Sequence, residues 1–209
     1  MTLSKKELEI LLERCEPFRE PRVELEQYVT PAPIAADLLN LALLKGDIAD
    51  KGVFDLGCGT GRLAIGAYLL GAAEVRGFDI DEEALELAKE NAARAGAFVE
   101  WVEADVADIE EWCDTVVMNP PFGVKRPGAD RAFLTAALRT GKVIYTMHKT
   151  TTRDFIKKYI DRLGGKVTDI AAVDFGLPRS YGFHRKRLKK IEVDVYRIEK
   201  RRMKDDRGR

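Results

Sequence analysis

The apolar positions of the chain begin with a helical period. Ser4 and Glu7 form a capping box, and Pro17 ends the pattern, so a short N-terminal helix is predicted before the rest of the domain. Its apolar stripe consists of Leu8, Leu11, Leu12 and Cys15. A second helical pattern covers residues 34–44 and stops at Gly46.

From residue 52 onward, short apolar runs alternate with helical patterns. Strands are predicted at 52–56, 74–79, 98–103, 115–118 and 143–147, and helices at 61–70, 82–95, 131–139 and 151–163. This alternation predicts an α/β fold with a mostly parallel, doubly wound sheet. Two late strands, 166–175 and 191–198, have no helix between them, so they are expected to form an antiparallel hairpin at the sheet edge.

The length of 209 residues fits one domain. We expect N-terminal helices and a cofactor-covering segment at 1–46, a core at 47–199 and a basic tail at 200–209. No apolar run approaches the roughly 18 to 20 residues of a membrane span, and the polar N-terminus lacks a secretory signal, so no membrane association and a cytoplasmic location are expected.

Metal-ligating residues are few and scattered. Cys15, Cys58 and Cys113 form no Cys-x-x-Cys pair, and packing is the simplest role for all three. His148 and His184 lie far apart without an acidic or Cys companion at ligand spacing, which favours a structural or substrate-contact role. We therefore predict no metal site.

Charge and amide usage are uneven. Residues 179–209 hold 13 of the 35 Lys and Arg but 5 of the 35 Asp and Glu, a balance of +8 that leaves −8 for the remainder. Such an electropositive end is typical of polyanion binding, although a solvated tail has the same composition. The chain has a single glutamine, Gln27, and three asparagines, which suggests a thermophilic source. The retained Gln27 and Asn119 are then candidates for hydrogen-bonding roles.

The first chemical motif ends the strand at 52–56. Residues 53–61 read Val-Phe-Asp-Leu-Gly-Cys-Gly-Thr-Gly, with Asp55 directly before the glycines at 57, 59 and 61. Glycines at a strand-to-helix turn allow a ligand to approach the backbone closely. The spacing differs from the Gly-x-Gly-x-x-Gly of dinucleotide sites and resembles the loop with which class I methyltransferases hold the methionine end of S-adenosylmethionine. A glycine turn without a ligand is the alternative.

Two further strand ends carry acidic residues. Asp79 ends the strand at 74–79, where a carboxylate can accept hydrogen bonds from both ribose hydroxyls, whereas Asp81 is expected to cap the following helix. After the strand at 98–103, Asp105 and Val106 match the pair that in class I methyltransferases touches the adenine of the cofactor, where Asp105 can accept a hydrogen bond from the amine and Val106 offers a backbone N–H.

The motif Asn119-Pro120-Pro121-Phe122 follows the strand at 115–118. An amine conjugated to a ring is a poor nucleophile, and the Asn119 oxygen and Pro120 carbonyl can each accept one of its N–H bonds and so turn its lone pair toward a methyl group. Proline restricts the backbone that aims this carbonyl, and Phe122 offers a face for a flipped-out base. A strand stopped by Pro-Pro is the structural alternative.

Basic residues form two candidate contacts for a nucleic acid. Lys125 and Arg126 lie in a glycine-bounded loop that resembles a substrate lid, although a plain surface loop is an equal alternative. The second segment interleaves rings with cations, as base stacking and phosphate pairing require, unless it is a turn whose rings pack inward. Its candidates are Tyr181, Phe183, His184, Arg185, Lys186 and Arg187.

Together these motifs, with residues 26–31, 148–149, 181–184 and 191–194, resemble the methyltransferase-like-five family of adenine-N6 ribosomal RNA methyltransferases over nearly the whole chain. The resemblance implies a Rossmann-like class I fold, S-adenosylmethionine as cofactor, small-subunit ribosomal RNA as substrate and a small zinc-binding activator protein as partner. The complete set of cofactor residues is then Gln27, Tyr28, Thr30, Asp55, Gly57, Gly59, Thr60, Arg62, Asp79, Ile80, Asp105 and Val106. The position of Thr60 and the basic extension from Lys200 depart from the family pattern.

Three other functions stay open at this point. Guanine-N2 ribosomal RNA methyltransferases also use Asn-Pro-Pro-Phe, and glutamine-N5 protein methyltransferases use Asn-Pro-Pro-Tyr. Phe122 and the basic C-terminal third disfavour the protein substrate. A cofactor-binding RNA scaffold without activity is the third, and the retained Asn119 argues against it.

Overall fold

A computed structural model describes residues 3–176 and 190–201, with the backbone alone for 174–176 and 190–191. Its helices are α1 (Lys5–Glu13), α2 (Ala32–Leu44), α3 (Arg62–Leu69), α4 (Glu82–Ala95), α5 (Ala129–Thr140) and α6 (Arg153–Arg162), with short 3-10 turns η1 (Val23–Leu25), η2 (Val106–Asp108) and η3 (Thr150–Thr152). Its strands are β1 (Gly52–Leu56), β2 (Glu74–Asp79), β3 (Glu100–Glu103), β4 (Cys113–Met118), β5 (Gly141–Lys149), β6 (Gly165–Gly176) and β7 (Lys190–Lys200).

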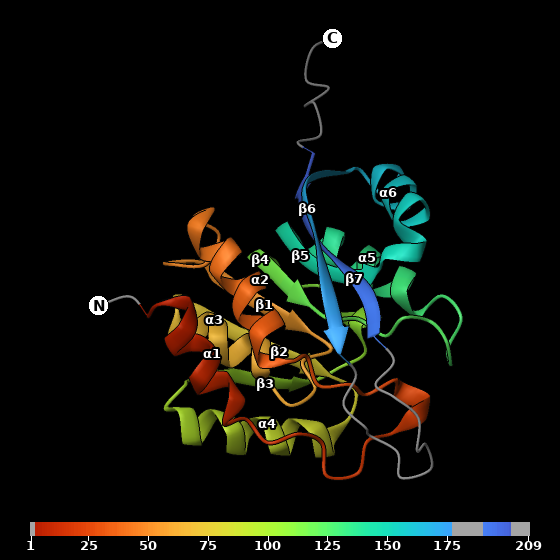
Figure 1. Cartoon of the computed structure of the whole chain (residues 1–209). Coiled ribbons are helices and arrows are strands. Elements are labelled where there is room, and N and C mark those ends of the chain that lie inside the picture. Colours follow the sequence, from red (N-terminus) through yellow and green to blue (C-terminus); the bar gives the residue numbers. More distant parts are fainter. Residues whose placement is uncertain (1–2, 177–189, 202–209) are drawn as a thin grey trace.

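The strands form one seven-stranded sheet in the order β3-β2-β1-β4-β5-β7-β6. The first five are parallel, and β7 is antiparallel to both β5 and β6. The predicted doubly wound sheet with a C-terminal antiparallel hairpin is thereby confirmed. The structure adds that β7 lies between β5 and β6, so the last of the described strands is internal and β6 forms one edge of the sheet (Figure 1).

Helices cover both faces of the sheet (Figure 1). The helices α1, α2 and α3 contribute Leu12, Leu39 and Ile65 to one apolar core on one face. On the opposite face, α5 and α6 bury Leu134 and Ile156 in a second core. The amphipathic patterns of these helices therefore serve two cores separated by one sheet.

The predicted element bounds shift by a few residues. The strand expected from residue 98 begins at Glu100, because pairing with β2 starts at the Arg76 and Glu100 register, and Phe98 before it is 79% exposed. The helix expected from residue 151 is preceded by η3 and begins at Arg153. Both late strands are longer than predicted because they pair along their whole length. The cysteines are buried in packed positions, as expected.

A buried polar network joins β7 to the region after β5. Asp194 is fully buried and accepts hydrogen bonds from Arg153 Nε and Nη2 at 2.8 and 2.7 Å. The Nε2 atom of neighbouring His148 lies 3.0 Å from the Thr146 hydroxyl oxygen. Burial lowers the pKa of the His148 imidazole to about 3. His148 is thus a neutral packed residue, which agrees with the structural one of its two predicted roles.

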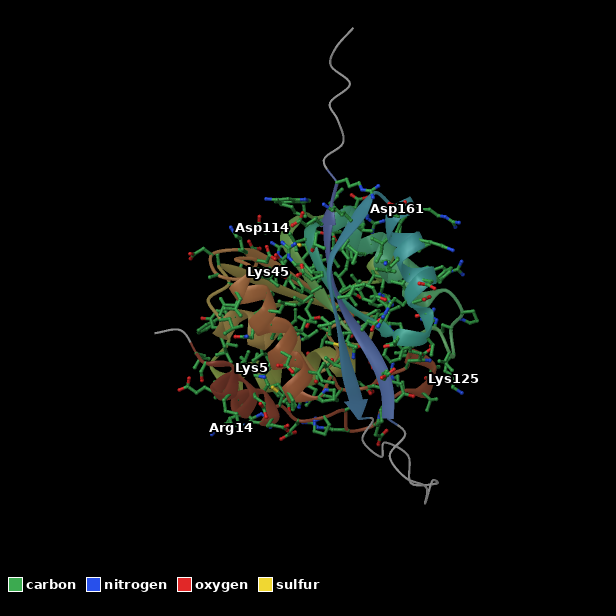
Figure 2. The ribbon with its side chains drawn as sticks, turned by 45° about the horizontal axis from the view of Figure 1, so that its top comes forward. Lys5, Arg14, Lys45, Asp114, Lys125 and Asp161 are labelled. Carbon is green, nitrogen blue, oxygen red and sulfur yellow. The ribbon has the colours of Figure 1, made fainter. Side chains whose placement is uncertain are left out.

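Asp114, on β4, and Asp161, on α6, lie at the end of the molecule where the parallel strands begin, whereas Lys125 lies at the opposite end (Figure 2). In this fold ligands bind at the carboxyl ends of the strands. Lys125 therefore lies at the end where a substrate is expected. Within the described part of the chain, none of the helices has the length and apolar content to span a membrane.

Candidate cofactor and catalytic site

A cavity of about 360 Å³ opens at the carboxyl ends of β1, β2, β3 and β4, a size in the range of small-molecule sites. Its lining comes from the loops after these strands, from residues 25–30, here called the covering segment, and from the start of α5. All twelve predicted cofactor residues line it. Their specific contacts with a cofactor stay predictions, but the fold brings the whole set together.

The glycine loop after β1 has the backbone that the motif predicts. Gly57, Gly59 and Gly61 have φ angles of 67°, 52° and 81°, in the left-handed region that favours glycine. A Cβ on Gly59 would lie 2.8 Å from the Phe18 ring, and one on Gly57 would lie 2.7 Å from the Phe133 ring. The backbone conformation therefore favours glycine here, and a Cβ at either position would also force the facing ring to shift.

Asp79 is held at the end of β2 by two backbone donors. Its Oδ2 accepts from Gly59 N at 2.8 Å and its Oδ1 from Asp81 N at 3.1 Å. Each oxygen keeps one lone pair for a ligand. Burial raises the pKa of this carboxyl, and the backbone donors oppose that rise. As predicted, Asp81 caps α4, where it accepts from Glu83 N at 3.2 Å.

Asp55 and Arg62 are two buried ionisable side chains that line the cavity together with the glycine loop. Asp55 Oδ2 accepts from Ala64 N at 2.9 Å, and burial raises the pKa of this carboxyl to about 8. Arg62 donates from Nη1 to Thr30 O at 2.7 Å and from Nη2 to Cys15 O at 2.9 Å. Burial lowers the pKa of its guanidinium. Arg62 therefore ties the N-terminal segment to the start of α3.

The loop after β3 forms the adenine side of the cavity in the predicted assignment. Asp105 is exposed and its Oδ1 accepts from Ala107 N at 2.9 Å, which caps η2 and leaves Oδ2 toward solvent or ligand. Arg139 fixes this turn from α5 by donating from Nη2 to the carbonyls of Val106, Ala107 and Ile109 at 3.0, 2.8 and 2.9 Å. Ile80 is 48% exposed at the rim.

The polar side chains of the covering segment form hydrogen bonds mostly within the protein itself. Gln27 Oε1 accepts from Arg22 N at 2.7 Å, and its Nε2 donates to Asp81 Oδ2 at 2.6 Å. Its amide therefore fastens the segment to the turn after β2 while the residue lines the cavity. Tyr28, half-buried, and Thr30, buried, also line the cavity.

The motif after β4 divides into two parts. Asn119 Nδ2 donates to Thr30 Oγ1 at 3.0 Å, and both Asn119 and Pro121 line the cavity. Pro120 is buried outside the lining. Phe122 also lies outside it, half-buried against the core, with Lys149 Nζ 5.3 Å from its ring centroid. The Phe122 ring, which was expected to stack on a base, is therefore contacted by the Lys149 ammonium in this structure.

Unpartnered polar atoms point to a charged ligand. Among the described residues, the buried side-chain polar atoms without a hydrogen-bond partner are Asp55 Oδ1, Arg62 Nε and Asn119 Oδ1. All three residues line the same cavity. Buried polar groups are nearly always paired, so these atoms mark places for ligand groups. S-adenosylmethionine, with an ammonium, a carboxylate and a sulfonium, fits this donor and acceptor set.

The lining residues that were not predicted include Phe18, Glu26 and Phe133. Their contacts join distant parts of the chain, so local patterns do not indicate these contacts, although Glu26 lies in the 26–31 stretch that carries the family resemblance. Of the predicted RNA residues, Lys125 and Arg126 are exposed and Arg126 also lines the cavity. The remaining candidates, residues 181–187, lie outside the described residues. The described residues contain no group of three His, Cys, Asp or Glu placed to hold a metal.

Comparison with known proteins identifies methyltransferases as relatives of this chain. The model of the methyltransferase small domain matches residues 34–142. The chain is 42% identical to rRNA N(6)-adenosine-methyltransferase METTL5 of Danio rerio, over 92% of this chain and 97% of that protein, and 39% identical to Mettl5 of Drosophila melanogaster, over 94% and 97%. The crystal structure of a proposed RNA methyltransferase of Pyrococcus horikoshii, 42% identical, superposes with a TM-score of 0.88 over 96% of this chain and 99% of that one. The chain therefore belongs to the METTL5 family of rRNA N(6)-adenosine-methyltransferases, within the methyltransferase small-domain fold.

Proposed function

We propose that this protein transfers a methyl group from S-adenosylmethionine to the N6 amine of an adenine in small-subunit ribosomal RNA. Family membership confirms the predicted methyltransferase class and its methyl donor. The observation that carries the proposal on the structural side is the Asn119 side chain. Its oxygen is buried, has no partner in the protein and belongs to the cavity at the switch point between β1 and β4.

The cavity residues sort by the cofactor group that each would hold. Asp79 keeps lone pairs for the ribose hydroxyls, and Asp105 and the Val106 N–H serve the adenine ring. Asp55 offers an acceptor to the ammonium, and Arg62 offers a cation to the carboxylate. When bound, the cofactor supplies an electrophilic methyl group on its sulfonium.

Asn119 then acts on the target amine. Its Oδ1 and the Pro120 carbonyl each accept one N–H, so the amine loses conjugation with its ring and presents its lone pair to the methyl group. The Thr30 hydroxyl, by accepting from Asn119 Nδ2, fixes which amide atom faces the cavity. This step needs positioning and oriented dipoles from the protein, and no covalent intermediate on a side chain.

Phe122 and the nearby cations provide the substrate contacts in this proposal. A flipped-out adenine stacks on the Phe122 ring, for which the Lys149 ammonium moves aside toward a phosphate. Lys125 and Arg126, exposed on the loop before α5, pair with further phosphates. The basic residues at 185–187 extend this surface on sequence grounds.

We also expect the partner and location that the sequence implies. The small zinc-binding activator protein is expected to bind this chain and to raise its methylation rate, and the site of action is expected to be cytoplasmic. Co-expression of the two proteins followed by gel filtration tests the complex. Two separate elution peaks at micromolar concentration would refute it.

The deciding experiment is nucleoside mass spectrometry. In-vitro-transcribed small-subunit ribosomal RNA is incubated with the purified protein and S-adenosylmethionine, digested and analysed, with Asn119→Ala as the inactive control. We expect N6-methyladenosine that depends on Asn119. N2-methylguanosine in its place would establish the guanine alternative, and unmethylated RNA would contradict the proposal.

A further inference from the structure

Glu26 has an unusual backbone for its residue type. It directly follows η1 and has φ 52° and ψ 42°, the left-handed conformation that usually selects glycine or asparagine. Its side chain is also 8% exposed, although a carboxylate is rarely buried without partners. Because a glycine would fit this backbone better, the presence of glutamate indicates that its side chain is needed.

That side chain binds the catalytic segment. Glu26 Oε2 accepts from Phe122 N at 2.9 Å, and Oε1 accepts from Lys125 N at 2.7 Å. Pro120 and Pro121 have no amide hydrogen, so the Phe122 N–H is the first backbone donor after Asn119. No regular element holds residues 119–128, which lie between β4 and α5. The carboxylate of Glu26 supplies acceptors to this stretch that neighbouring backbone does not.

The same N-terminal segment holds Asn119 from the other side. Thr30, four residues after Glu26, accepts from Asn119 Nδ2, and the Thr30 carbonyl accepts from buried Arg62 at the start of α3. The side chain of Asn119 and the backbone that follows it are thus fixed by one short segment. Gln27, between the two contacts, fastens this segment to Asp81.

We propose that Glu26 is a positioning residue for methyl transfer, whose carboxylate holds residues 122–125 so that the Asn119 oxygen and the Pro120 carbonyl are aimed at the reacting amine. This inference rests on the proposed function of the same site. Glu26 contacts the motif only through backbone amides, and its contribution is the placement of the acceptors. A displacement of such groups by about 1 Å is enough to cost roughly a hundredfold in rate.

Two variants of the full-length protein separate positioning from simple stability. Glu26→Gln keeps the shape but replaces one acceptor oxygen with an NH2 group, which faces a backbone N–H. Glu26→Gly removes the carboxylate and relieves the left-handed backbone, so it should unfold at a temperature equal to or above that of Glu26→Gln. Glu24→Gln, an exposed glutamate of the same segment, is the matched control.

The rate is measured in single turnovers with saturating S-adenosylmethionine and in-vitro-transcribed small-subunit ribosomal RNA, and cofactor affinity by calorimetry with S-adenosylhomocysteine. We expect both Glu26 variants to lose roughly tenfold to a hundredfold in the methyl-transfer rate. Their cofactor Kd should change less than about threefold, and Glu24→Gln should match wild type. A wild-type rate in Glu26→Gln, or a rate loss that only follows a loss of cofactor affinity or thermal stability, overturns the inference.

A second measurement does not depend on the RNA substrate. Amide hydrogen exchange at Phe122 and Lys125 is followed in wild type, Glu26→Gln and Glu24→Gln. We expect faster exchange at these two amides in Glu26→Gln alone, because the acceptor is lost. Unchanged protection would overturn the role of Glu26 even if RNA methylation is confirmed. If wild type leaves RNA adenine unmethylated while the two amides depend on Glu26, the proposed function fails and the positioning of the segment stands.

Discussion

The burial of Asp55 predicts an unusual dependence of stability on pH. The carboxyl is 1% exposed, one of its oxygens has no partner, and burial raises its pKa to about 8. In the unfolded chain the pKa of an aspartate is about 4. Between these values the cofactor-free folded protein therefore binds one proton that the unfolded chain has released. Stability from this group is fully present below about pH 4 and is lost as the pH rises toward 8.

The size of the effect follows from one proton. Each pH unit between about 5 and 7.5 should reduce the free energy of unfolding by about 1.4 kcal/mol through Asp55 alone. Asp55→Asn removes this titration, keeps an oxygen for the Ala64 amide and changes the volume little. The difference in unfolding free energy between variant and wild type should accordingly grow by about 3 kcal/mol from pH 5 to pH 7 in favour of the variant.

Chemical denaturation of both proteins without cofactor, at half-unit steps from pH 5 to pH 8.5, measures this difference. Parallel curves over the whole range would refute the reasoning, because they would show that Asp55 titrates alike in the folded and unfolded states. A difference that grows in the opposite direction would refute it equally. Taking the difference between the two proteins cancels the titration of all other groups that the substitution leaves unperturbed.

Cofactor binding should reverse this preference of the folded protein for the protonated form of Asp55. A cation paired with Asp55 favours the carboxylate, so binding of S-adenosylhomocysteine near pH 7 should release about one proton, and its affinity should rise up to tenfold per pH unit below 8. Calorimetry in two buffers of different ionisation enthalpy counts that proton. Asp55→Asn should release none and bind more weakly, so the more stable variant would be the poorer enzyme.

The other predictions concern single contacts of the site. Asp79→Ala should weaken cofactor binding by about 1.5 to 3 kcal/mol, and unchanged affinity by calorimetry would remove Asp79 from the site. Asn119→Ala should lower turnover roughly a hundredfold at saturating cofactor, and Asn119→Asp, which keeps an acceptor, should retain more; a wild-type rate in Asn119→Ala would remove Asn119 from the catalytic centre. Replacing the three cations at 185–187 with glutamine should flatten the salt dependence of RNA affinity without changing cofactor affinity, whereas an identical slope would place the RNA elsewhere.

Much of the fold could be predicted because its causes are local. The alternation of strand and helix patterns identified the parallel core, and the end of each strand located Asp55, Asp79 and Asn119 at one edge of the sheet. The glycines of the 57–61 loop were predictable for the same reason, since their left-handed angles are a property of the turn itself. Asp81 at the N-terminus of its helix is another case of purely local chemistry.

The contacts that individual side chains make were decided by the tertiary structure. Gln27 was predicted to contact the cofactor, and folding brings its amide to Asp81, 54 residues away, where it holds the covering segment. The Phe122 ring, expected to be ready for a base, is contacted by Lys149. The place of β7 inside the sheet was likewise beyond a hairpin prediction, which gives the pairing of two strands but not which of them joins β5.

Glu26 shows why the sequence alone predicts the elements of this protein but not the contacts of a buried side chain. In the sequence Glu26 lies in the 26–31 stretch that carries the family resemblance, but its contacts with Phe122 and Lys125 span 96 and 99 residues and are not indicated there. Periodicity and turn chemistry report on forces between near neighbours, and they determined the elements and the strand ends of this protein. A buried carboxylate acquires its partners only when distant segments pack together and exclude water, so its task is defined by the assembled fold.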